Sequence, residues 1–580
     1  MRSALVLLSA LLAVAGIPAG AAGPATEWHY IVVEVDSSGR TEPVYQTRVR
    51  LAAPRASLSP EQVALAHERN DLPNKGVLDV ELSVGSEVVF RDAVPFERFV
   101  HVEFPVDKEG RLVRADAALS RAAAAVRVPA VAGAVLSLRA GAASPLELDL
   151  DRLDELAAGF RLAGAVPQGI ASRLSSTGSP ANRVDLLIMG DGYTSAQQST
   201  FTNDAANTAA AFFSITPYSQ YQNYVNVLTL FTASSQSGAD HPPYLAQCSG
   251  DNPACCSDPE AQGDPLAGTY RATAFDARYC AAMVHRLLVV DASKVLAAAA
   301  AVPDWDKIFV LVNDSVYGGS GGLISVTSMN ASSVDVIRHE YGHSFSHLAD
   351  EYESPFPGYP ACSDIFGPPC EPNVTDQTSF AAVKWKSWIL PTTPVPTPEG
   401  SSYAGALGLF EGARYLSTGM YRPRESQCLM RALGLPFCSI CAQAYVKTLY
   451  DGGWGVPANG IDPIEPGSES PPPGTVQVTG SQLFSVGVLS PAGGPPATVA
   501  WSVNGAVRAG QTGSSFLLQP QGTGTFIVTV TVTDATSLVN PAMAGTSLTS
   551  SRQWTVMVNG TGSLLFADGF ESGDLSRWLH

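Results

Sequence analysis

One short segment combines residues that bind metals with residues that move protons. The stretch VIRHEYGHSFSHLADEYE, from Val336 to Glu353, holds three histidines and four carboxylates. On a helix, His339 and His343 share a face, so their imidazoles can hold one zinc ion. Glu340 follows the first histidine, where its carboxylate reaches a water on the metal without ligating the metal. This H-E-x-x-H spacing predicts hydrolysis by a zinc-activated water, with Glu340 as general base and then general acid.

Two histidines do not complete a zinc site, so a third ligand is needed. Asp350 returns to the helix face of His339, but on a continuous helix it would lie about 10 Å along the axis from His343. We therefore expect the helix to end near Ser346 and the chain to fold back, which makes Asp350 the favoured third ligand. Other candidates remain open, namely Glu351, His347, Glu371 and Glu411.

The sequence around this segment resembles a known family. HEYGHSFSHLADEY is similar to the active-site segment of the IgA-peptidase family of bacterial secreted zinc metallopeptidases. Three more segments, VDLLIMGDGYT, VNDSVYGGSGG and GARYLSTGMYRPRESQCLM, resemble other signature segments of that family in the same order. The resemblance runs from about Ala165 to Tyr450 and extends into the β-rich region before it.

The resemblance implies a metzincin-like endopeptidase with one catalytic Zn²⁺. Such folds place a methionine turn under the zinc, and Met430 in QCLMR matches that position. Metzincins usually bend at a glycine after the zinc helix, whereas none lies between Gly342 and Gly358 here. Small metallopeptidases with an H-E-x-x-H…D-x-Y arrangement use an aspartate as third ligand, and the run Asp350-Glu351-Tyr352 is similar to theirs.

Two further features concern the substrate. Tyr421 and Arg422, in MYRPRE, are candidates for transition-state or substrate contacts, because such side chains can stabilise a developing oxyanion. A surface or packing role explains either residue equally well. The glycine-rich YGGSGG and the strand after it predict a sheet edge to which an extended peptide can be added. A loop with tight turns explains the same glycines equally well.

The rest of the chain divides by composition and periodicity. Residues 26–150 alternate apolar and polar positions in short runs, which predicts an N-terminal β-sandwich. That region shows no cluster suited to chemistry, so packing, folding or adhesion is its expected role. The predicted catalytic domain (165–455) is followed by a Pro-rich linker (456–474), an immunoglobulin-like β domain (475–560) and a C-terminal tail (561–580). The predicted fold is thus multidomain: an α/β (α+β) metzincin-like domain flanked by two β-sandwiches.

Strand and helix patterns alternate within the catalytic region. RVDLLIM is a continuous apolar run, typical of a strand buried on both faces. We expect a helix capped by Thr194 or Ser195 after it, then the strand NYVNVLTLF, a helix over DARYCAAMVHRLLVV (276–290) and the strand KIFVLVN. This alternation is characteristic of an α/β layered domain.

Charge and targeting signals restrict the protein's surroundings. The formal net charge of −18, with only 35 Lys+Arg in 580 residues, argues against a nucleic-acid partner. Residues 1–22 combine an arginine, an apolar run and small residues, which predicts a secretory signal peptide. No later run is suited to span a membrane. We therefore expect a secreted protein that acts on proteins or peptides, and the tail FADGFESGDLSRW resembles endings of exported Gram-negative proteins.

The nine cysteines all lie between residues 248 and 441, in three groups. In an oxidising compartment they predict about four disulfides and one remaining thiol. Cys438 and Cys441 form a C-x-x-C pair of the kind that binds zinc, but their group offers only three sulfurs and no nearby histidine. Disulfides are therefore favoured there too.

Other functions remain compatible with the sequence. One is a non-catalytic adhesion, carbohydrate-binding or protein-binding secreted protein with a vestigial peptidase domain. Another is a zinc-dependent esterase or amidase, which uses the same water chemistry. Family resemblance does not assign immunoglobulin A as the substrate, because specificity lies in loops.

Overall fold

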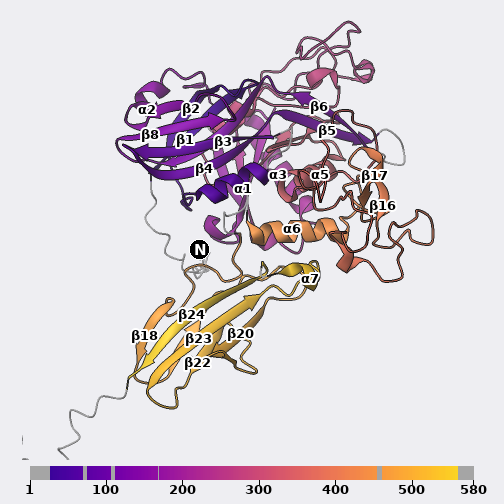
Figure 1. Ribbon diagram of the computed structural model, residues 1–580. Helices are drawn as coiled ribbons and strands as arrows, with labels where there is room; N and C mark the ends of the chain where they lie inside the picture. Colours follow the sequence, from indigo (N-terminus) through magenta and orange to yellow (C-terminus); the bar gives the residue numbers. More distant parts are fainter. Residues whose placement is uncertain are drawn as a thin grey trace, which may run out of the picture.

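The computed structural model of the protein describes residues 27–69, 75–105, 112–166, 169–452, 460–545 and 547–559. The predicted signal peptide, the predicted tail and the first residues of the predicted linker lie outside these ranges. Within them, no helix is both long and apolar enough to cross a bilayer. The chain is a mixed α/β structure with several separate sheets, consistent with a multidomain β-rich protein (Figure 1).

The N-terminal region consists of two sheets and a two-stranded ribbon. The sheets have the strand orders β2-β1-β7 and β4-β3-β8-β9, and β5 pairs with β6. The elements are β1 (Glu27–Asp36), β2 (Thr41–Arg50), α1 (Pro60–Arg69), β3 (Lys75–Val84), β4 (Glu87–Glu97), β5 (Phe99–Pro105), β6 (Leu112–Ala118), β7 (Arg121–Pro129), β8 (Ala134–Ala140), β9 (Leu146–Asp149) and α2 (Leu150–Ala157). Along β8, every second residue is buried, because one face of its sheet packs on the core.

Strand β1 is buried on both faces, from position 28 to position 35. Its outer face is covered by α4 (Ala292–Ala299) of the central domain. The hydroxyl of Tyr30 donates to the carbonyl of Leu296 over 2.8 Å, and the indole of Trp305 donates to that hydroxyl over 3.2 Å. The N-terminal region and the central domain therefore share one hydrophobic core.

The central domain is organised around a six-stranded sheet of order β10-β12-β11-β13-β15-β14. Its inner strands are parallel, and the two edge strands run antiparallel to their neighbours. The elements are β10 (Ile170–Ser175), β11 (Val184–Asp191), α3 (Gln198–Phe212), β12 (Val225–Phe231), α4, β13 (Lys307–Val312), β14 (Gly319–Ser320), β15 (Ile324–Ser328), α5 (Ser333–Ser346), β16 (Phe410–Ala413), β17 (Leu416–Arg422) and α6 (Ser439–Asp451). Short 3₁₀ turns are η1 (Pro180–Asn182), η2 (Ser195–Gln197), η3 (Gln222–Tyr224), η4 (Pro259–Gly263), η5 (Ala281–Met283) and η6 (Lys386–Trp388).

Two local predictions for this domain agree with the structure. All positions of β11 are buried, as its continuous apolar run predicts. The helix expected after Thr194 begins with η2, where Thr194 and Gln197 form a capping box, and continues as α3.

The helix predicted over 276–290 is wrong. This segment contains only the turn η5, and the helix of this part of the chain is α4, farther on. Cys280 and Ala282 have left-handed backbones with φ of 59° and 49°, which a regular helix does not allow. A disulfide from Cys256 to Cys280 and a bridge between Arg278 and Val289 hold the chain in its irregular path. These tertiary constraints override a helical apolar pattern.

The C-terminal region is a separate β structure below the central domain in Figure 1. A five-stranded sheet of order β18-β24-β23-β20-β21 faces the pair β19-β22, around a core that includes Trp501 and Trp554. The elements are β18 (Gly474–Val478), β19 (Gln482–Ser485), β20 (Thr498–Val503), β21 (Ala506–Val507), β22 (Ser515–Leu518), β23 (Gly524–Thr533), α7 (Pro541–Ala544) and β24 (Thr549–Val558). In the predicted linker before them, Ile461 and Ile464 are buried, so its described part packs against folded structure.

The cysteine pairing differs from the prediction. Disulfides join Cys248 to Cys255, Cys256 to Cys280 and Cys362 to Cys370. The predicted fourth disulfide is absent from the described residues, since Cys428, Cys438 and Cys441 are all unbonded and buried. The first two cysteine groups are thus used for cross-links, and the third group has another arrangement.

Candidate metal centre

Helix α5 presents His339 and His343 on one face, with their Nε2 atoms 3.0 Å apart. The helix ends at Ser346, because His347 adopts the left-handed conformation with φ of 53°. The backbone N–H of Leu348 then donates to the carbonyl of Gly342 over 3.2 Å and closes the turn. The break therefore occurs where the sequence argument required it, although a histidine rather than a glycine takes the strained position.

The turn brings Asp350 back to the histidines. Its Oδ1 atom lies 3.1 Å from Nε2 of His339 and 3.4 Å from Nε2 of His343. Tyr415 donates from its hydroxyl to Oδ2 of Asp350, and Arg114 donates to the Tyr415 oxygen over 2.9 Å. The contacts of Tyr415 and Arg114 orient the Asp350 carboxylate. The sequence alone did not single out either residue.

Backbone carbonyls determine which ring nitrogens face the centre. Nδ1 of His339 lies 2.9 Å from the carbonyl of Leu429, and Nδ1 of His343 lies 2.6 Å from the carbonyl of Leu348. A carbonyl only accepts, so each Nδ1 carries a hydrogen, and each ring in its neutral form turns an Nε2 lone pair inward. Two lone pairs 3.0 Å apart repel each other unless a cation lies between them.

A fourth donor comes from the N-terminal region. Glu103, on β5, contacts Nε2 of His339 through Oε2, and the same oxygen lies 3.4 Å from Nε2 of His343. The donor atoms of Glu103, His339, His343 and Asp350 all lie within 4.8 Å of one another. The expectation that the N-terminal region lacks groups suited to chemistry is therefore wrong.

The charges of this cluster favour a cation at its centre. Burial alone would raise the pKa of Glu103, but the two histidines outweigh burial and hold that pKa well below its usual value. For Asp350 the same attraction exceeds burial and repulsion from Glu103, so its pKa is also lowered. Burial lowers the pKa of His343, whereas Asp350 and Glu103 together raise it to about 10. The pKa of His339 is raised well above its usual value for the same reason.

The carboxylate of Glu340 lies close to a second residue of β5. Its Oε2 atom lies 2.8 Å from Nε2 of His101, and both side chains are buried. Within the described structure, neither carboxylate oxygen of Glu340 has a hydrogen bond of good geometry. The backbone N–H of Gly321 donates to the carbonyl of His101 over 2.8 Å, which adds β5 beside the edge strand β14.

Met430 lies against helix α5. A Cβ atom added to Gly342 would stand 2.9 Å from its Sδ atom, so a larger residue there would require the methionine to shift. The carbonyl of Met430 accepts from the N–H of Glu351 over 2.8 Å, beside Asp350. The methionine thus packs between the helix and the segment that returns Asp350.

Residues 172–248, 254–402 and 399–449 match a family model described as IgA Peptidase M64. The chain is similar to a family of peptidases. The matched ranges include α5, Asp350 and Met430, but they exclude the strand that carries His101 and Glu103. The match supports a peptide hydrolase, and among curated proteins no match is found.

Tyr421 and Arg422, the sequence candidates for substrate contacts, bind residues outside the donor cluster. The guanidinium of Arg422 is buried and donates to the carbonyls of Glu411, Gly412 and Glu425 and to the Glu399 carboxylate. The Tyr421 hydroxyl lies 3.5 Å from Oε1 of Glu411, and its backbone pairs with Thr375. None of these contacts among the described residues includes the histidines, so the role of Tyr421 and Arg422 at the transition state stays a prediction.

The alternative candidates for the third metal ligand also contact residues outside the donor cluster. Glu371 receives the guanidinium of Arg414 over 2.9 Å, and Glu351 lies among the three unbonded cysteines. Glu411 lies beside Tyr421, as described above. The ring of His347 borders a small cavity next to His343 without belonging to the donor cluster. Of the acidic and histidine candidates after α5, the structure brings only Asp350 to the histidine pair.

Proposed function

We propose that the protein is a secreted zinc-dependent endopeptidase whose metal is held by His339, His343 and Asp350. The observation that carries this proposal is the convergence of their donor atoms beside Glu340, where α5 ends at Ser346 and the chain turns back. The similarity of the surrounding region to the IgA Peptidase M64 family supports the same chemistry.

The donor set fits zinc. Two imidazole Nε2 atoms and a carboxylate oxygen are ligands that zinc prefers, and three protein ligands leave a position open for chemistry. The rings are already oriented by the carbonyls of Leu429 and Leu348. When bound, zinc supplies Lewis-acid activation of water and of the scissile carbonyl.

The residues of the chain perform the remaining steps. The carboxylate of Glu340 takes a proton from the attacking water and delivers it to the leaving amine. Tyr415 keeps Asp350 oriented through its hydroxyl. Met430 packs against α5 at Gly342, which agrees with a methionine turn.

The N-terminal region holds this site closed. Glu103 takes a fourth donor position, and His101 binds the carboxylate that must act as base. The backbone of His101 also pairs with Gly321, at the sheet edge where an extended peptide would be added. The cavity beside His343 has a volume of about 40 Å³, room for about three waters. The proposed enzyme is therefore latent until β5 and β6 move away.

Export is the remaining part of the proposal. Three disulfides are typical of a protein that folds in an oxidising compartment. Together with the apolar start of the chain, they support a signal peptide at 1–22 and an extracellular protein or peptide substrate. The ending of the chain favours a Gram-negative source.

The decisive experiment compares cleavage of a peptide library by the wild type, Glu103→Ala and the double variant Glu103→Ala/Glu340→Gln. We expect chelator-sensitive cuts, read by mass spectrometry, and a loss of about 10²–10⁴-fold when Glu340 is replaced. Cleavage by the wild type but not by Glu103→Ala would refute latency and leave the peptidase intact. A library that stays uncut in every sample would refute the peptidase and favour a binding protein with a vestigial site.

A further inference from the structure

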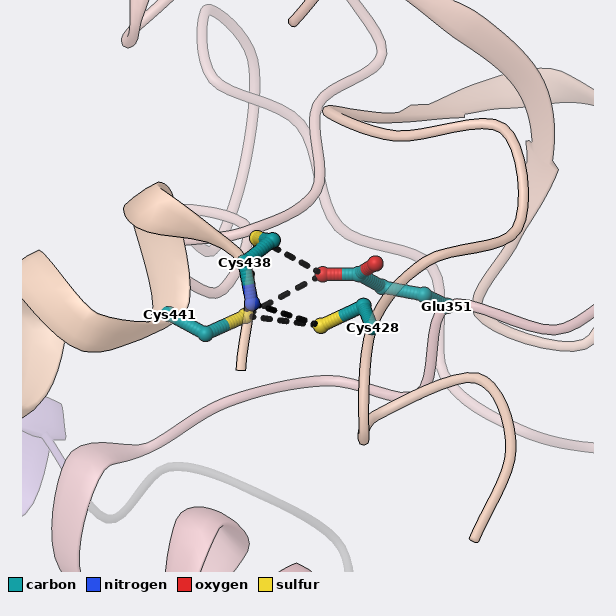
Figure 2. A group of neighbouring side chains, drawn as sticks. All are labelled: Glu351, Cys428, Cys438 and Cys441. Carbon is teal, nitrogen blue, oxygen red and sulfur yellow. Dashed lines mark hydrogen bonds between the residues drawn. The ribbon is translucent and has the colours of Figure 1, made fainter. Parts of the chain in front are cut away.

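A second group of metal-binding side chains lies beside the candidate centre, and no chemistry described so far uses it. Cys428, Cys438, Cys441 and Glu351 place one ligand atom each within 4.8 Å of all the others. All four residues are buried. Figure 2 shows the Glu351 carboxylate and the Cys428 sulfur facing the C-x-x-C pair at the start of α6.

The sulfur spacings are those of a shared metal rather than of a disulfide. Sγ of Cys441 lies 3.6 Å from Sγ of Cys428 and 3.5 Å from Sγ of Cys438. Thiolates bound at about 2.3 Å to one tetrahedral zinc are about 3.8 Å apart. The six other cysteines of the chain are all paired in disulfides. These three stay unbonded although their sulfurs lie close together.

Glu351 completes a set of four. Its Oε1 atom lies 3.1 Å from Sγ of Cys441 and 3.8 Å from Sγ of Cys438, and Asn373 donates to that oxygen over 3.0 Å. In the described residues, Oε2 of Glu351 is buried and has no hydrogen-bond partner. Nor does any ion pair of the described structure neutralise this carboxylate, because Arg431 donates to the Glu351 backbone and to Glu353 instead. In its ionised form, a buried carboxylate aimed at three sulfurs is stabilised by a cation among them.

The position of the group explains what such an ion would do. Cys438 precedes α6 and Cys441 lies in its first turn, Cys428 lies two residues before Met430, and Glu351 follows Asp350. One ion would therefore join α6, the methionine loop and the segment that returns Asp350 to the histidines. The same loop supplies the Leu429 carbonyl that orients His339.

We propose that Cys428, Cys438, Cys441 and Glu351 bind a structural zinc ion, separate from the ion at His339 and His343, that fixes the loops carrying Asp350 and Met430. Zinc suits three thiolates and a carboxylate in a closed tetrahedral site, and it has no redox chemistry that would oxidise the thiols. The bound ion also protects these thiols from forming the disulfide that an oxidising compartment would otherwise favour.

The metal content of purified full-length variants tests this proposal independently of catalysis. We expect two zinc ions per chain in the wild type, one in His343→Ala, and none in His343→Ala/Cys441→Ser, measured by plasma mass spectrometry. X-ray absorption of His343→Ala should show zinc–sulfur scattering at about 2.3 Å. If the proposed peptidase site is wrong, the wild type keeps one sulfur-bound zinc and His343→Ala changes nothing. A His343→Ala protein without sulfur-bound zinc overturns the structural site.

Two further measurements address folding of the cysteine variant. Glu351→Gln keeps the side-chain volume and all three sulfurs, so we expect a folded protein that loses the second zinc to a chelator which leaves the wild type loaded. Denatured with chelator, the wild type should expose three reactive thiols, since its other six cysteines are cross-linked. One thiol, with a disulfide mapped between two of Cys428, Cys438 and Cys441, would contradict the proposal.

Discussion

The Oε2 atom of Glu340 lies 2.8 Å from Nε2 of His101, and the two residues come from different regions of the chain. Two positions farther along the same strand, Glu103 contacts His339. Residues two apart on a strand face the same side, so β5 directs one imidazole ring and one carboxylate into the site together. The strand thus contacts the proposed general base and the proposed metal ligands at the same time.

Removing these contacts should activate the proposed enzyme. We expect Glu103→Ala to increase chelator-sensitive peptide cleavage by about tenfold or more, which corresponds to loss of about 1.4 kcal/mol of closure energy. His101→Ala should act in the same direction, because it frees the carboxylate of Glu340. Initial rates on a fluorogenic peptide measure the effect.

The control for this activation is Glu81→Ala. Glu81 lies on β3 of the same region and pairs with Arg91 at the surface over 3.2 Å, so its loss should leave the rate unchanged. A lower rate in Glu103→Ala, with metal retained, would show that Glu103 serves catalysis rather than latency.

Gly321 leaves no room for a side chain, because an added Cβ would overlap Oε2 of Glu340 and approach His101. We therefore expect Gly321→Ala to displace the base and lower kcat/KM by about 10–100-fold, since small misplacements at a site are costly. Metal content should not change. Gly405→Ala is the matched control, since nothing lies within 4 Å of the added atom there. Equal activity of both variants would mean that Glu340 acts from another position.

The sequence predicts the part of this site that is local. His339, Glu340 and His343 follow from helical spacing alone, and the return of Asp350 follows from the length that a continuous helix would impose. The left-handed turn at His347 carries no such signal, because glycine, the usual marker, is absent. The bend was therefore predicted from helix geometry and not from the residue types at the turn.

The missed residues depend on contacts between distant segments. His101 and Glu103 alternate with apolar residues in FVHVEFP, and both are buried. Two ionisable side chains on the same face of a buried strand are the one signal that the sequence offered. Their partners on α5 are known only once the N-terminal region has docked.

The cysteines show the same limit. Spacing alone does not separate a disulfide from a metal ligand in the C-x-x-C pair, since both need the same residues. The decision rests on Glu351, which the turn after α5 brings to Cys441. The false helix at 276–290 has a related origin, because the disulfide at Cys280 determines the local backbone.

Tyr415 should influence the metal without touching it. Its hydroxyl donates to Oδ2 of Asp350, so Tyr415→Phe removes an orienting hydrogen bond and keeps the ring. Loss of such an outer contact lowers metal affinity by about 10–100-fold. Competition with a chromophoric chelator measures this, and Tyr270→Phe, which loses only a bond to the Ala254 carbonyl, is the control. Unchanged affinity in Tyr415→Phe would indicate that Asp350 is oriented by the metal alone.

The buried ring of His241 should make the central domain less stable in alkaline solution. Its Nδ1 lies 2.8 Å from Asp264 and its Nε2 lies 3.0 Å from Asp314, while Tyr279 stacks on the ring and His285 shares Asp264. Burial lowers the pKa of His241, but the two carboxylates outweigh burial and raise it above its usual value. The folded-state pKa thus exceeds the unfolded value of about 6.5, so the stabilisation is complete below that pH and is lost as pH rises through the folded-state pKa.

Replacing this histidine tests the sign of that dependence. His241→Gln leaves two buried carboxylates without their shared cation, and we expect a loss of about 3 kcal/mol near pH 6. The loss should shrink as the pH rises, because the wild type then gives up the same stabilisation. Thermal unfolding of both proteins between pH 6 and pH 9 measures the difference, with the half-exposed His67→Gln as control. A difference that grows with pH would mean that His241 is neutral in the folded protein and that the Asp264 and Asp314 carboxylates are held in another way.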